Sequence, residues 1–335
     1  MNYQEFLEYI KDNLAQYLEQ QEQLSKGQTD EGRKNNTQRE KKENYLVELH
    51  KVIKNNGIIL DGITIRKEGE NISPNIYLNS YFESYQMGKP LAIIMEEIIY
   101  CYQRAKAENA LQVADVLDFK LVKDKIVLRL VHYEKNKEQL KCCPYKKYLD
   151  LAVTFRYIAS KDAMGIASSL ITNQEFEAWG IGIEELYRIA LFNTMREFPW
   201  RMDSLAKVIF ESFQTKDKER LLKEVLRGAE SFEEMENGVN MYVLTNDTGL
   251  NGATCILYDN VIKNFAKVQE SNVFLLPSSV HEMMLVPEDE DTDPGFLSQL
   301  VIEANQNAVG FIDLLSDHIY YYDREKDQVI IYGQN

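Results

Sequence analysis

Apolar residues near the start of the chain recur every three or four positions, with polar and mostly acidic residues between them. This spacing predicts an amphipathic helix of about six turns over residues 1–24. Its apolar stripe consists of Tyr3, Phe6, Leu7, Ile10, Leu14, Tyr17 and Leu18. Because the polar side is acidic rather than basic, we expect the stripe to pack on the body of the protein and not on a membrane.

The next segment, residues 25–44, contains no large apolar residue, which predicts a solvated linker. Residues 45–145 then form a predicted N-terminal α+β region. Strand-like runs cover residues 46–65 and 72–78, and Pro90 stands where a helix begins. The apolar face of that helix is Leu91, Ile94, Met95, Ile98, Ile99 and Tyr102.

A C-terminal α+β region, residues 146–335, is predicted around a unit at 238–288. Before this unit the pattern predicts strands at 148–159 and 165–172, then helices at 183–197 and 203–227. The unit itself has a strand, an amphipathic helix and two more strands. The predicted buried stripe of its helix is Leu257, Val261, Phe265 and Val268, widened by Tyr258 and Ile262.

The end of the chain predicts one more helix and a hairpin. Asp293-Pro294 is typical of a helix start, and the expected inward residues are Phe296, Leu297, Leu300, Val301 and Ala304. Strands at 319–323 and 328–332 follow. The whole pattern predicts an α+β fold with mixed or antiparallel sheets covered by amphipathic helices, and an extended N-terminal helix.

The net charge of the chain limits the kinds of partner it is expected to bind. The 335-residue chain has 53 acidic and 38 basic residues, a formal net charge of −15. Non-specific binding to nucleic acid or to an anionic membrane needs a positive field, so we expect neither. From His281 to the end, twelve acidic residues stand against Arg324 and Lys326 alone. This excess serves solubility or meets a basic protein partner.

The compartment is expected to be the cytoplasm. The N-terminal residues lack the apolar run of a signal peptide, and no run approaches the roughly 18–20 residues needed to span a bilayer. The four cysteines, Cys101, Cys142, Cys143 and Cys255, have no CxxC spacing. We therefore expect neither a disulfide scaffold nor a structural zinc site.

Two motifs, one that begins with histidine and one acidic run, suggest metal binding, and both lack required ligands. His281-Glu282 resembles the start of a zinc protease motif, but the position for the second histidine is Leu285. The acidic run at residues 288–293 suggests calcium, but Pro294 and Leu300 occupy positions where an EF-hand needs Gly and Glu. No metal and no cofactor are predicted.

Polar residues at two predicted strand ends give the best place for a ligand. These are Thr245, Asn246, Ser278, Ser279 and His281. Strand ends commonly gather ligands in α/β proteins. A hydrolase would need a nucleophile elbow and an orienting acid, and the sequence marks neither. A hydroxyl-rich turn that closes the sheet is the simpler interpretation.

Three stretches together resemble a known family: LITNQEFEAWGIGIEELYRIALFNT (residues 170–194), TNDTGLNGATCILYD and NVFLLPSSVHEMML. The chain resembles a family of bacterial proteins of unknown function that is common in gut clostridia. It is more distantly similar to a broader uncharacterised bacterial family. The likeness covers nearly the whole chain, although the linker at 25–44 is longer and more charged than the family pattern. It implies no activity, substrate or catalytic residue.

Three hypotheses of function follow. The first is a non-enzymatic cytoplasmic protein-interaction or regulatory protein, whose partner meets the N-terminal helix or the acidic C-terminal face. The second is an unrecognised enzyme with a site at Asn246, Ser278, Ser279 and His281. The third is an acidic mimic of nucleic acid that inhibits a nucleic-acid-binding protein, which requires a continuous stripe of carboxylates.

Overall fold

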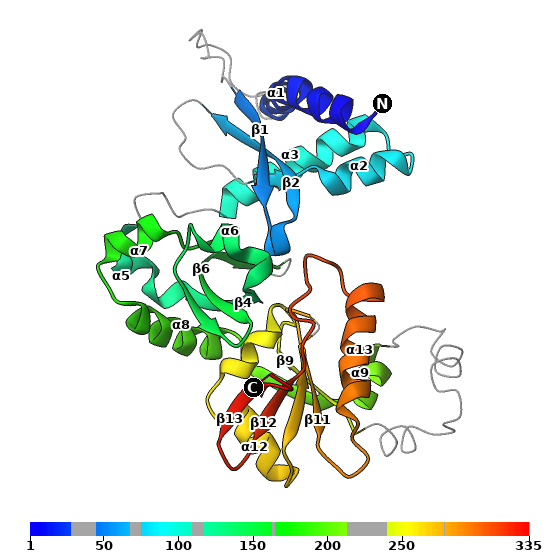
Figure 1. The fold of residues 1–335 in the computed structure, drawn as a ribbon. Coiled ribbons are helices and arrows are strands. Elements are labelled where there is room, and N and C mark those ends of the chain that lie inside the picture. Colours follow the sequence, from blue (N-terminus) through cyan, green and yellow to red (C-terminus); the bar gives the residue numbers. More distant parts are fainter. Residues whose placement is uncertain are drawn as a thin grey trace. The chain divides into compact units, whose positions relative to one another are not determined.

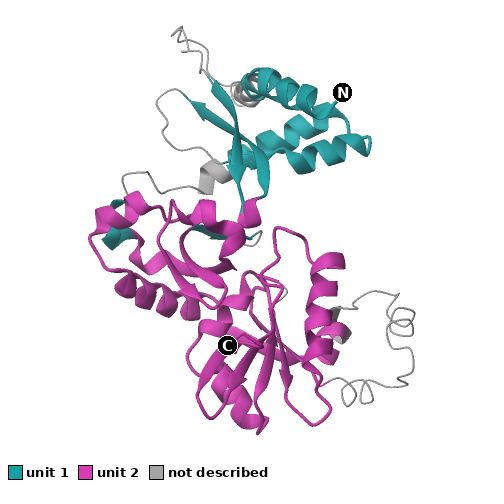
Figure 2. Ribbon diagram, viewed as in Figure 1, with its two compact units in different colours: residues 1–54, 58–121, 159–167 teal, residues 55–57, 122–158, 168–335 magenta. Residues whose placement is uncertain are grey.

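The computed structural model describes residues 1–27, 45–67, 75–108, 117–162, 165–212, 240–277 and 279–334. These residues form two compact units (Figure 2). Unit 1 comprises residues 1–54, 58–121 and 159–167, and unit 2 comprises residues 55–57, 122–158 and 168–335. Helices and antiparallel sheets occur in both, so the predicted α+β fold is confirmed. The division into an N-terminal region at 45–145 and a C-terminal region at 146–335 stays a prediction.

Unit 1 is a three-stranded antiparallel sheet with helices on one face. The sheet has the order β1 (Tyr45–Ile53), β2 (Ile59–Lys67), β3 (Asn75–Tyr77), and Val47 pairs with Ile65. Helices α1 (Tyr3–Gly27) and α3 (Leu91–Glu108) pack on it (Figure 1). The stripe predicted for α1 lies in this core, as does the predicted face of α3.

Two details of unit 1 differ from the predictions. Residues 25–27 belong to α1, so the predicted linker starts too early; its remainder, 28–44, lies outside the described residues. A further helix, α2 (Asn79–Gln86), follows β3 directly. Its Phe82 contacts the rings of Tyr3 and Phe6 at centroid distances of 4.9 and 5.3 Å. Tertiary aromatic contacts therefore stabilise a helix too short to be recognised by its pattern.

The first sheet of unit 2 has the order β4-β6-β5, and β7 also pairs with β6. Its strands are β4 (Ile126–His132), β5 (Tyr145–Tyr148), β6 (Leu151–Asp162) and β7 (Gly165–Leu170). Helix α8 (Ile183–Glu197) packs on β4, where the Thr194 hydroxyl accepts a 2.8 Å hydrogen bond from the Leu128 N–H. The predicted end of this helix before Phe198-Pro199 is confirmed.

Short helices complete this part of the chain. Helix α7 (Asn173–Trp179) begins with a capping box between Thr172 and Glu175, and Gly180, at φ 63°, ends it. The others are α5 (Phe119–Val122), η2 (Lys123–Lys125), η3 (Glu134–Asn136) and α6 (Lys137–Leu140). The three-residue segment η1 (Asn55–Gly57) connects β1 to β2 and groups with unit 2.

The second sheet of unit 2 is antiparallel, with the order β13-β12-β10-β11-β9-β8. Its strands are β8 (Trp200–Ser204), β9 (Tyr242–Asn246), β10 (Val273–Leu276), β11 (Met283–Pro287), β12 (Tyr320–Asp323) and β13 (Gln328–Ile331). Helix α13 (Pro294–Asn307) covers one face, where Leu297 and Val301 contact Phe274. Helix α12 (Val261–Val268) lies on the other, and its Phe265 contacts Tyr242. Because both faces are covered, all of β10 is buried.

The element order predicted for residues 238–335 is confirmed. Elsewhere in the C-terminal part the predicted strand at 148–159 is divided, because Tyr148 ends β5 and β6 begins at Leu151. Four more corrections follow. The 3₁₀ helix η4 (Gly252–Leu257) precedes α12, so Leu257 and Val268 do not share one helical stripe, and Val268, at the end of α12, is 77% exposed. Phe296, in the first turn of α13, is 64% exposed and does not face inward. Residues 203–204 belong to β8, because pairing with β9 outweighs local helix propensity. Helix α9 (Leu205–Ser212) then covers only the start of the predicted helix, and residues 213–239 lie outside the described residues.

Candidate functional site

Four of the five site residues predicted from the sequence are described, and Ser278 lies outside the described residues. Thr245 and Asn246 end β9, whereas Ser279 and His281 lie between β10 and β11. The structure brings three of them together. The Thr245 hydroxyl donates to the His281 carbonyl oxygen at 2.8 Å, and the His281 N–H donates to the Ser279 hydroxyl oxygen at 3.0 Å.

These contacts shape the backbone of the loops. The Asn246 side chain folds over its own turn, accepting from the Thr248 N–H at 3.0 Å and donating to the Leu250 carbonyl at 2.9 Å. Gly252 lies so close to His281 that an added Cβ would be 2.4 Å from the His281 carbonyl oxygen. The position therefore requires glycine, which lets the two loops touch.

Both ring nitrogens of His281 are engaged. The Asn251 N–H donates to His281 Nδ1 at 3.3 Å, so the ring proton of the neutral imidazole is on Nε2. Nε2 lies 3.3 Å from Asp313 Oδ1. Burial raises the pKa of the adjacent Glu282, and Asp313 raises it further, against the opposing effect of His281. The imidazole is thus held between a backbone amide and a carboxylate.

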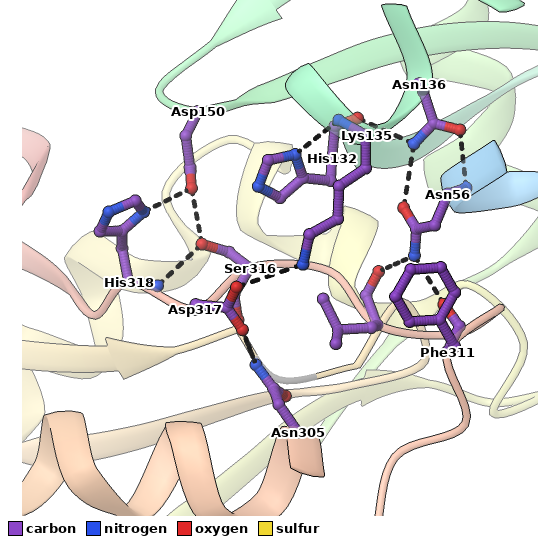
Figure 3. Close-up of polar contacts among 11 residues, drawn as sticks. Asn56, His132, Lys135, Asn136, Asp150, Asn305, Phe311, Ser316, Asp317 and His318 are labelled. Atoms are coloured by element: carbon purple, nitrogen blue, oxygen red, sulfur yellow. Dashed lines mark hydrogen bonds and ion pairs between the residues drawn. The ribbon is translucent and has the colours of Figure 1, made fainter.

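A second polar cluster centres on Asp150, in the two-residue turn between β5 and β6 (Figure 3). The Asp150 carboxylate accepts hydrogen bonds from Ser316 Oγ at 2.6 Å, Tyr320 OH at 2.5 Å and His318 Nδ1 at 2.9 Å. Burial acts to raise its pKa, but the three donors outweigh burial and lower it. Asp150 is therefore an ionised carboxylate at neutral pH.

His318 has the orientation of an imidazole supported by an aspartate. Its Nδ1 bonds Asp150, its side chain is 46% exposed, and its Nε2 lies 3.2 Å from Gln334 Nε2. An Asp–His pair whose Nε2 contacts only an exposed side-chain amide has the arrangement of a general base. The Ser316 hydroxyl donates to Asp150 and not to an imidazole nitrogen. Ser316 and His318 therefore do not form a nucleophile–base pair.

Three more ionisable groups border this cluster. Lys135 Nζ lies 3.2 Å from Asp317 Oδ2, and Asn305 Nδ2 donates to Asp317 Oδ1 at 2.8 Å. His132 Nδ1 accepts from the Lys135 N–H at 3.2 Å. Burial, and then the Lys135 ammonium, lower the pKa of His132. His132 is consequently neutral at pH 7, and the charges of Lys135 and Asp317 compensate each other.

The segment of residues 311–318, between α13 and β12, connects these contacts, and we call it the junction segment. Asn56, at φ 58°, donates through Nδ2 to the carbonyls of Phe311 and Leu314 at 2.7 and 2.8 Å. Asn136 Oδ1 accepts from the Asn56 N–H at 2.9 Å (Figure 3). With Asp313 held by His281 and Ser316 held by Asp150, the junction segment is fixed at both ends.

An open acidic cleft of about 750 Å³ lies at another place in unit 2. We call it the acidic cleft, and it is lined by Glu270, Ser271, Asn272, Glu288, Asp323, Arg324 and Glu325. Two of its carboxylates are held in place by donors from the chain itself. Glu288 Oε2 accepts from Asn272 Nδ2 at 2.8 Å and from Tyr321 OH at 2.7 Å. Asp323 Oδ1 accepts from the backbone N–H groups of Glu325 and Lys326, and its Oδ2 forms an ion pair with Lys326 Nζ at 2.8 Å.

Within the described ranges of the chain, no group of three or more His, Cys, Asp or Glu residues is arranged to hold a metal ion. No helix in those ranges is both long and apolar enough to cross a membrane. Cys143 is buried, and burial raises the pKa of its thiol to about 11, with the neighbouring Cys142 adding to the shift.

Fold and contacts together define an α+β protein whose polar clusters lie in loops between sheets. Residues 3–324 match the model of a family of unknown function (DUF5688), and the chain belongs to this family. This match confirms the resemblance to an uncharacterised family. No curated protein and no solved structure matches the chain.

The Asp150 cluster was not predicted from the sequence. Asp150 is 166 to 170 positions from its three partners along the chain, so no local spacing connects it to them. The one local signal is the polar triplet Ser316-Asp317-His318 in a loop between two apolar runs. Polar residues on a loop that a scaffold positions are a common place for function.

Proposed function

We propose that this protein is a non-enzymatic interaction or regulatory protein of the bacterial cytoplasm, and that the acidic cleft binds a basic segment of a protein partner. The observation that carries the proposal is the composition of the cleft. Four carboxylates, those of Glu270, Glu288, Asp323 and Glu325, line it with the single guanidinium of Arg324. A concave surface lined by charges of one sign attracts ligands of the opposite charge and increases their rate of association.

The cleft suits lysine or arginine side chains in two ways. Glu288 and Asp323 are positioned by hydrogen bonds from Asn272, Tyr321 and backbone amides, so little ordering is needed when a cation arrives. The donors to Glu288 are neutral and leave its negative charge in place, whereas the Lys326 ammonium partly compensates Asp323. A partner that supplies ammonium or guanidinium groups gains charge-assisted hydrogen bonds there.

Other surfaces have less support. The apolar stripe of α1 is buried in the core of unit 1, which favours the acidic cleft over the N-terminal helix as the partner surface. Several carboxylates after His281 already have partners: Asp313 has His281, Asp317 has Lys135 and Asp327 has Lys263. This pairing gives less support to a nucleic-acid mimic, and we expect no direct nucleic-acid binding by a chain of net charge −15.

The test uses a fluorescent oligolysine peptide and two double variants of equal charge. In the cleft variant, Glu270→Gln and Glu325→Gln remove two carboxylates that line the cleft. In the control, Asp289→Asn and Glu290→Gln remove two exposed carboxylates that are not among its lining residues. We expect fluorescence anisotropy to give at least about tenfold weaker binding for the cleft variant, worth about 1.4 kcal/mol, and a much smaller loss for the control.

Two comparisons distinguish binding in the cleft from a response to net charge: the dependence on salt, and the pair of double variants with equal charge. Binding in the cleft should weaken as ionic strength rises, because the attraction is screened. Equal weakening of both double variants would mean that the peptide responds only to net charge, and the proposal would fail. A pull-down from bacterial lysate with wild type and the cleft variant then identifies the partner as the protein retained by wild type alone.

A general-base enzyme is the second candidate, and the Asp150–His318 pair favours it. An enzyme using Asn246, Ser278, Ser279 and His281 has less support, because His281 Nε2 faces the Asp313 carboxylate, whereas His318 Nε2 contacts only the exposed Gln334 side-chain amide. The test is a screen with ester and phosphoester substrates. Turnover that is lost in His318→Gln and kept in His281→Gln would support the Asp150–His318 pair, and turnover unchanged in both would remove it.

A further inference from the structure

A second cleft in unit 2, of about 570 Å³, borders the β5–β6 turn, helix α12 and the β12–β13 hairpin. We propose that this cleft binds a small organic anion with an apolar body. The proposal does not depend on the acidic cleft, because the two share no lining residue. The volume lies within the range of about 300–1,000 Å³ that is usual for small-molecule sites.

The backbone is strained on one wall of the cleft. Tyr148 pairs with Leu151, so Leu149 and Asp150 form a two-residue turn, and Leu149 has φ 55°. The left-handed region costs a leucine about 1–2 kcal/mol, whereas glycine occupies it freely. The three hydrogen bonds of Asp150 hold the turn in place and offset this cost. Strain that is maintained in this way is concentrated at functional sites.

The polar groups of the cleft are mainly donors. Asp327 contributes a carboxylate, but Lys263 and Tyr322 OH, at 2.6 Å, each occupy one of its oxygens. The Tyr148 side chain is half-buried, its hydroxyl makes no hydrogen bond with the described residues, and burial raises its pKa. An ammonium group has three N–H donors, and the ion pair with Asp327 engages only part of the Lys263 ammonium. The cleft therefore offers the remaining donors of Lys263 and the Tyr148 hydroxyl to a ligand that brings oxygen acceptors and negative charge.

The remaining wall is apolar. Leu149, Ile256, Ile262 and Val329 line the cleft beside these donors. An apolar wall with a few donors at fixed positions is typical of sites that bury the body of a ligand and orient its charged end. In a protein of net charge −15, an anion gains nothing from the overall field. Local donors and apolar contact must therefore supply the affinity, which is why the anion needs an apolar body.

The probe is 8-anilinonaphthalene-1-sulfonate, an organic anion with an apolar body whose fluorescence rises when water is excluded. Lys263→Gln is compared with Lys267→Gln, a matched loss of charge one helical turn later at an exposed position that does not line the cleft. We expect Lys263→Gln to weaken binding at least about tenfold and Lys267→Gln less than about twofold. Tyr148→Phe should weaken binding by about fivefold, the loss of one hydrogen bond.

A neutral analogue completes the test. N-phenyl-1-naphthylamine has the same rings without the sulfonate, so its binding should be equal in wild type and Lys263→Gln. The inference is overturned if the anion fails to saturate wild type, or if the Lys263 and Lys267 variants bind it equally. Circular dichroism and the urea midpoint confirm that each variant is folded. Binding of oligolysine to the acidic cleft should not change in Lys263→Gln, so failure of one proposal is distinguishable from failure of the other.

Discussion

Replacing Asp150 with alanine removes the acceptor that holds the β5–β6 turn against the junction segment. In the wild type, its carboxylate accepts from Ser316 Oγ at 2.6 Å, Tyr320 OH at 2.5 Å and His318 Nδ1 at 2.9 Å. Alanine at position 150 leaves the turn able to form and accepts none of these bonds. We therefore expect a loss of stability, because the buried donor groups of Ser316 and Tyr320 are left without an acceptor.

The magnitude follows from the burial of each donor. Ser316 and Tyr320 are both 0% exposed, and a buried hydroxyl without a partner costs about 1–3 kcal/mol. His318 is half exposed and bonds water instead, at little cost. Relaxation of Leu149 out of the left-handed region returns about 1–2 kcal/mol. The free energy of unfolding should fall by about 2–4 kcal/mol.

Tryptophan fluorescence is a suitable assay, because the two tryptophans of the chain, Trp179 and Trp200, both belong to unit 2. Urea unfolding followed by this signal gives the stability of the unit that contains Asp150. Asp259→Ala is the control, an exposed aspartate in the same unit, and it should change stability by less than about 0.5 kcal/mol. The double variant with Tyr320→Phe should recover part of the loss, giving a coupling energy of about 1–2 kcal/mol.

Two results would refute this reasoning. If Asp150→Ala and Asp259→Ala shift the urea midpoint equally, then the carboxylate contributes no more than an ordinary surface group. If the effects of Asp150→Ala and Tyr320→Phe are additive, then the buried phenol does not depend on Asp150. In either case the junction segment is stabilised by its backbone and apolar contacts.

Three further predictions concern packing, pH and reactivity. Gly252→Ala should lower stability by about 1–3 kcal/mol, because its Cβ would meet the His281 carbonyl oxygen, while Gly310→Ala, with only ordinary contacts, should be near neutral in the same urea assay. The pKa of Asp150 is lowered in the folded state, so its ionised form adds stability that is complete above the unfolded pKa of about 4 and is lost as pH falls through the folded value. The stability difference between wild type and Asp150→Asn should therefore be constant near neutral pH and shrink below about pH 4, which urea unfolding across the acid range measures. Iodoacetamide at pH 8 should modify the exposed Cys142 and spare Cys143, whose thiol is buried with a pKa of about 11, and peptide mass spectrometry distinguishes the two sites.

Sequence periodicity correctly predicted the helices whose buried face is a regular stripe of apolar residues. The α1 stripe from Tyr3 to Leu18 and the α3 face from Leu91 to Tyr102 both lie in the core of unit 1. Asp293 caps α13 as its position before Pro294 indicates, accepting from the Gly295 N–H at 2.8 Å. Periodicity failed at helix ends. Val268 and Phe296 fit an apolar stripe but lie in the last and first turns of their helices, where contact with the sheet ends.

The candidate sites depend on contacts that no local pattern records. Thr245, Ser279 and His281 were predicted to share a sheet edge, and the structure brings them together through their backbones. The Asp150 cluster was missed because a lone aspartate in a turn has the same local sequence whether it faces water or three donors. The acidic cleft combines Glu270 and Glu288 with Asp323 from another strand, which only the pairing of β10 with β11 and β12 decides.

By itself, the sequence determined which faces of most helices and strands are buried. Apolar residues recur with a period of two residues in strands and 3.6 in helices, and this spacing can be read from the sequence alone. The sequence also determined the acidic character of the surface. Only the tertiary structure decided which polar side chains meet, since residues such as Asp150 and Ser316 are brought together by sheet order and loop path. That path depends on how all of the 165 residues between Asp150 and Ser316 fold together, and no single segment among them specifies it.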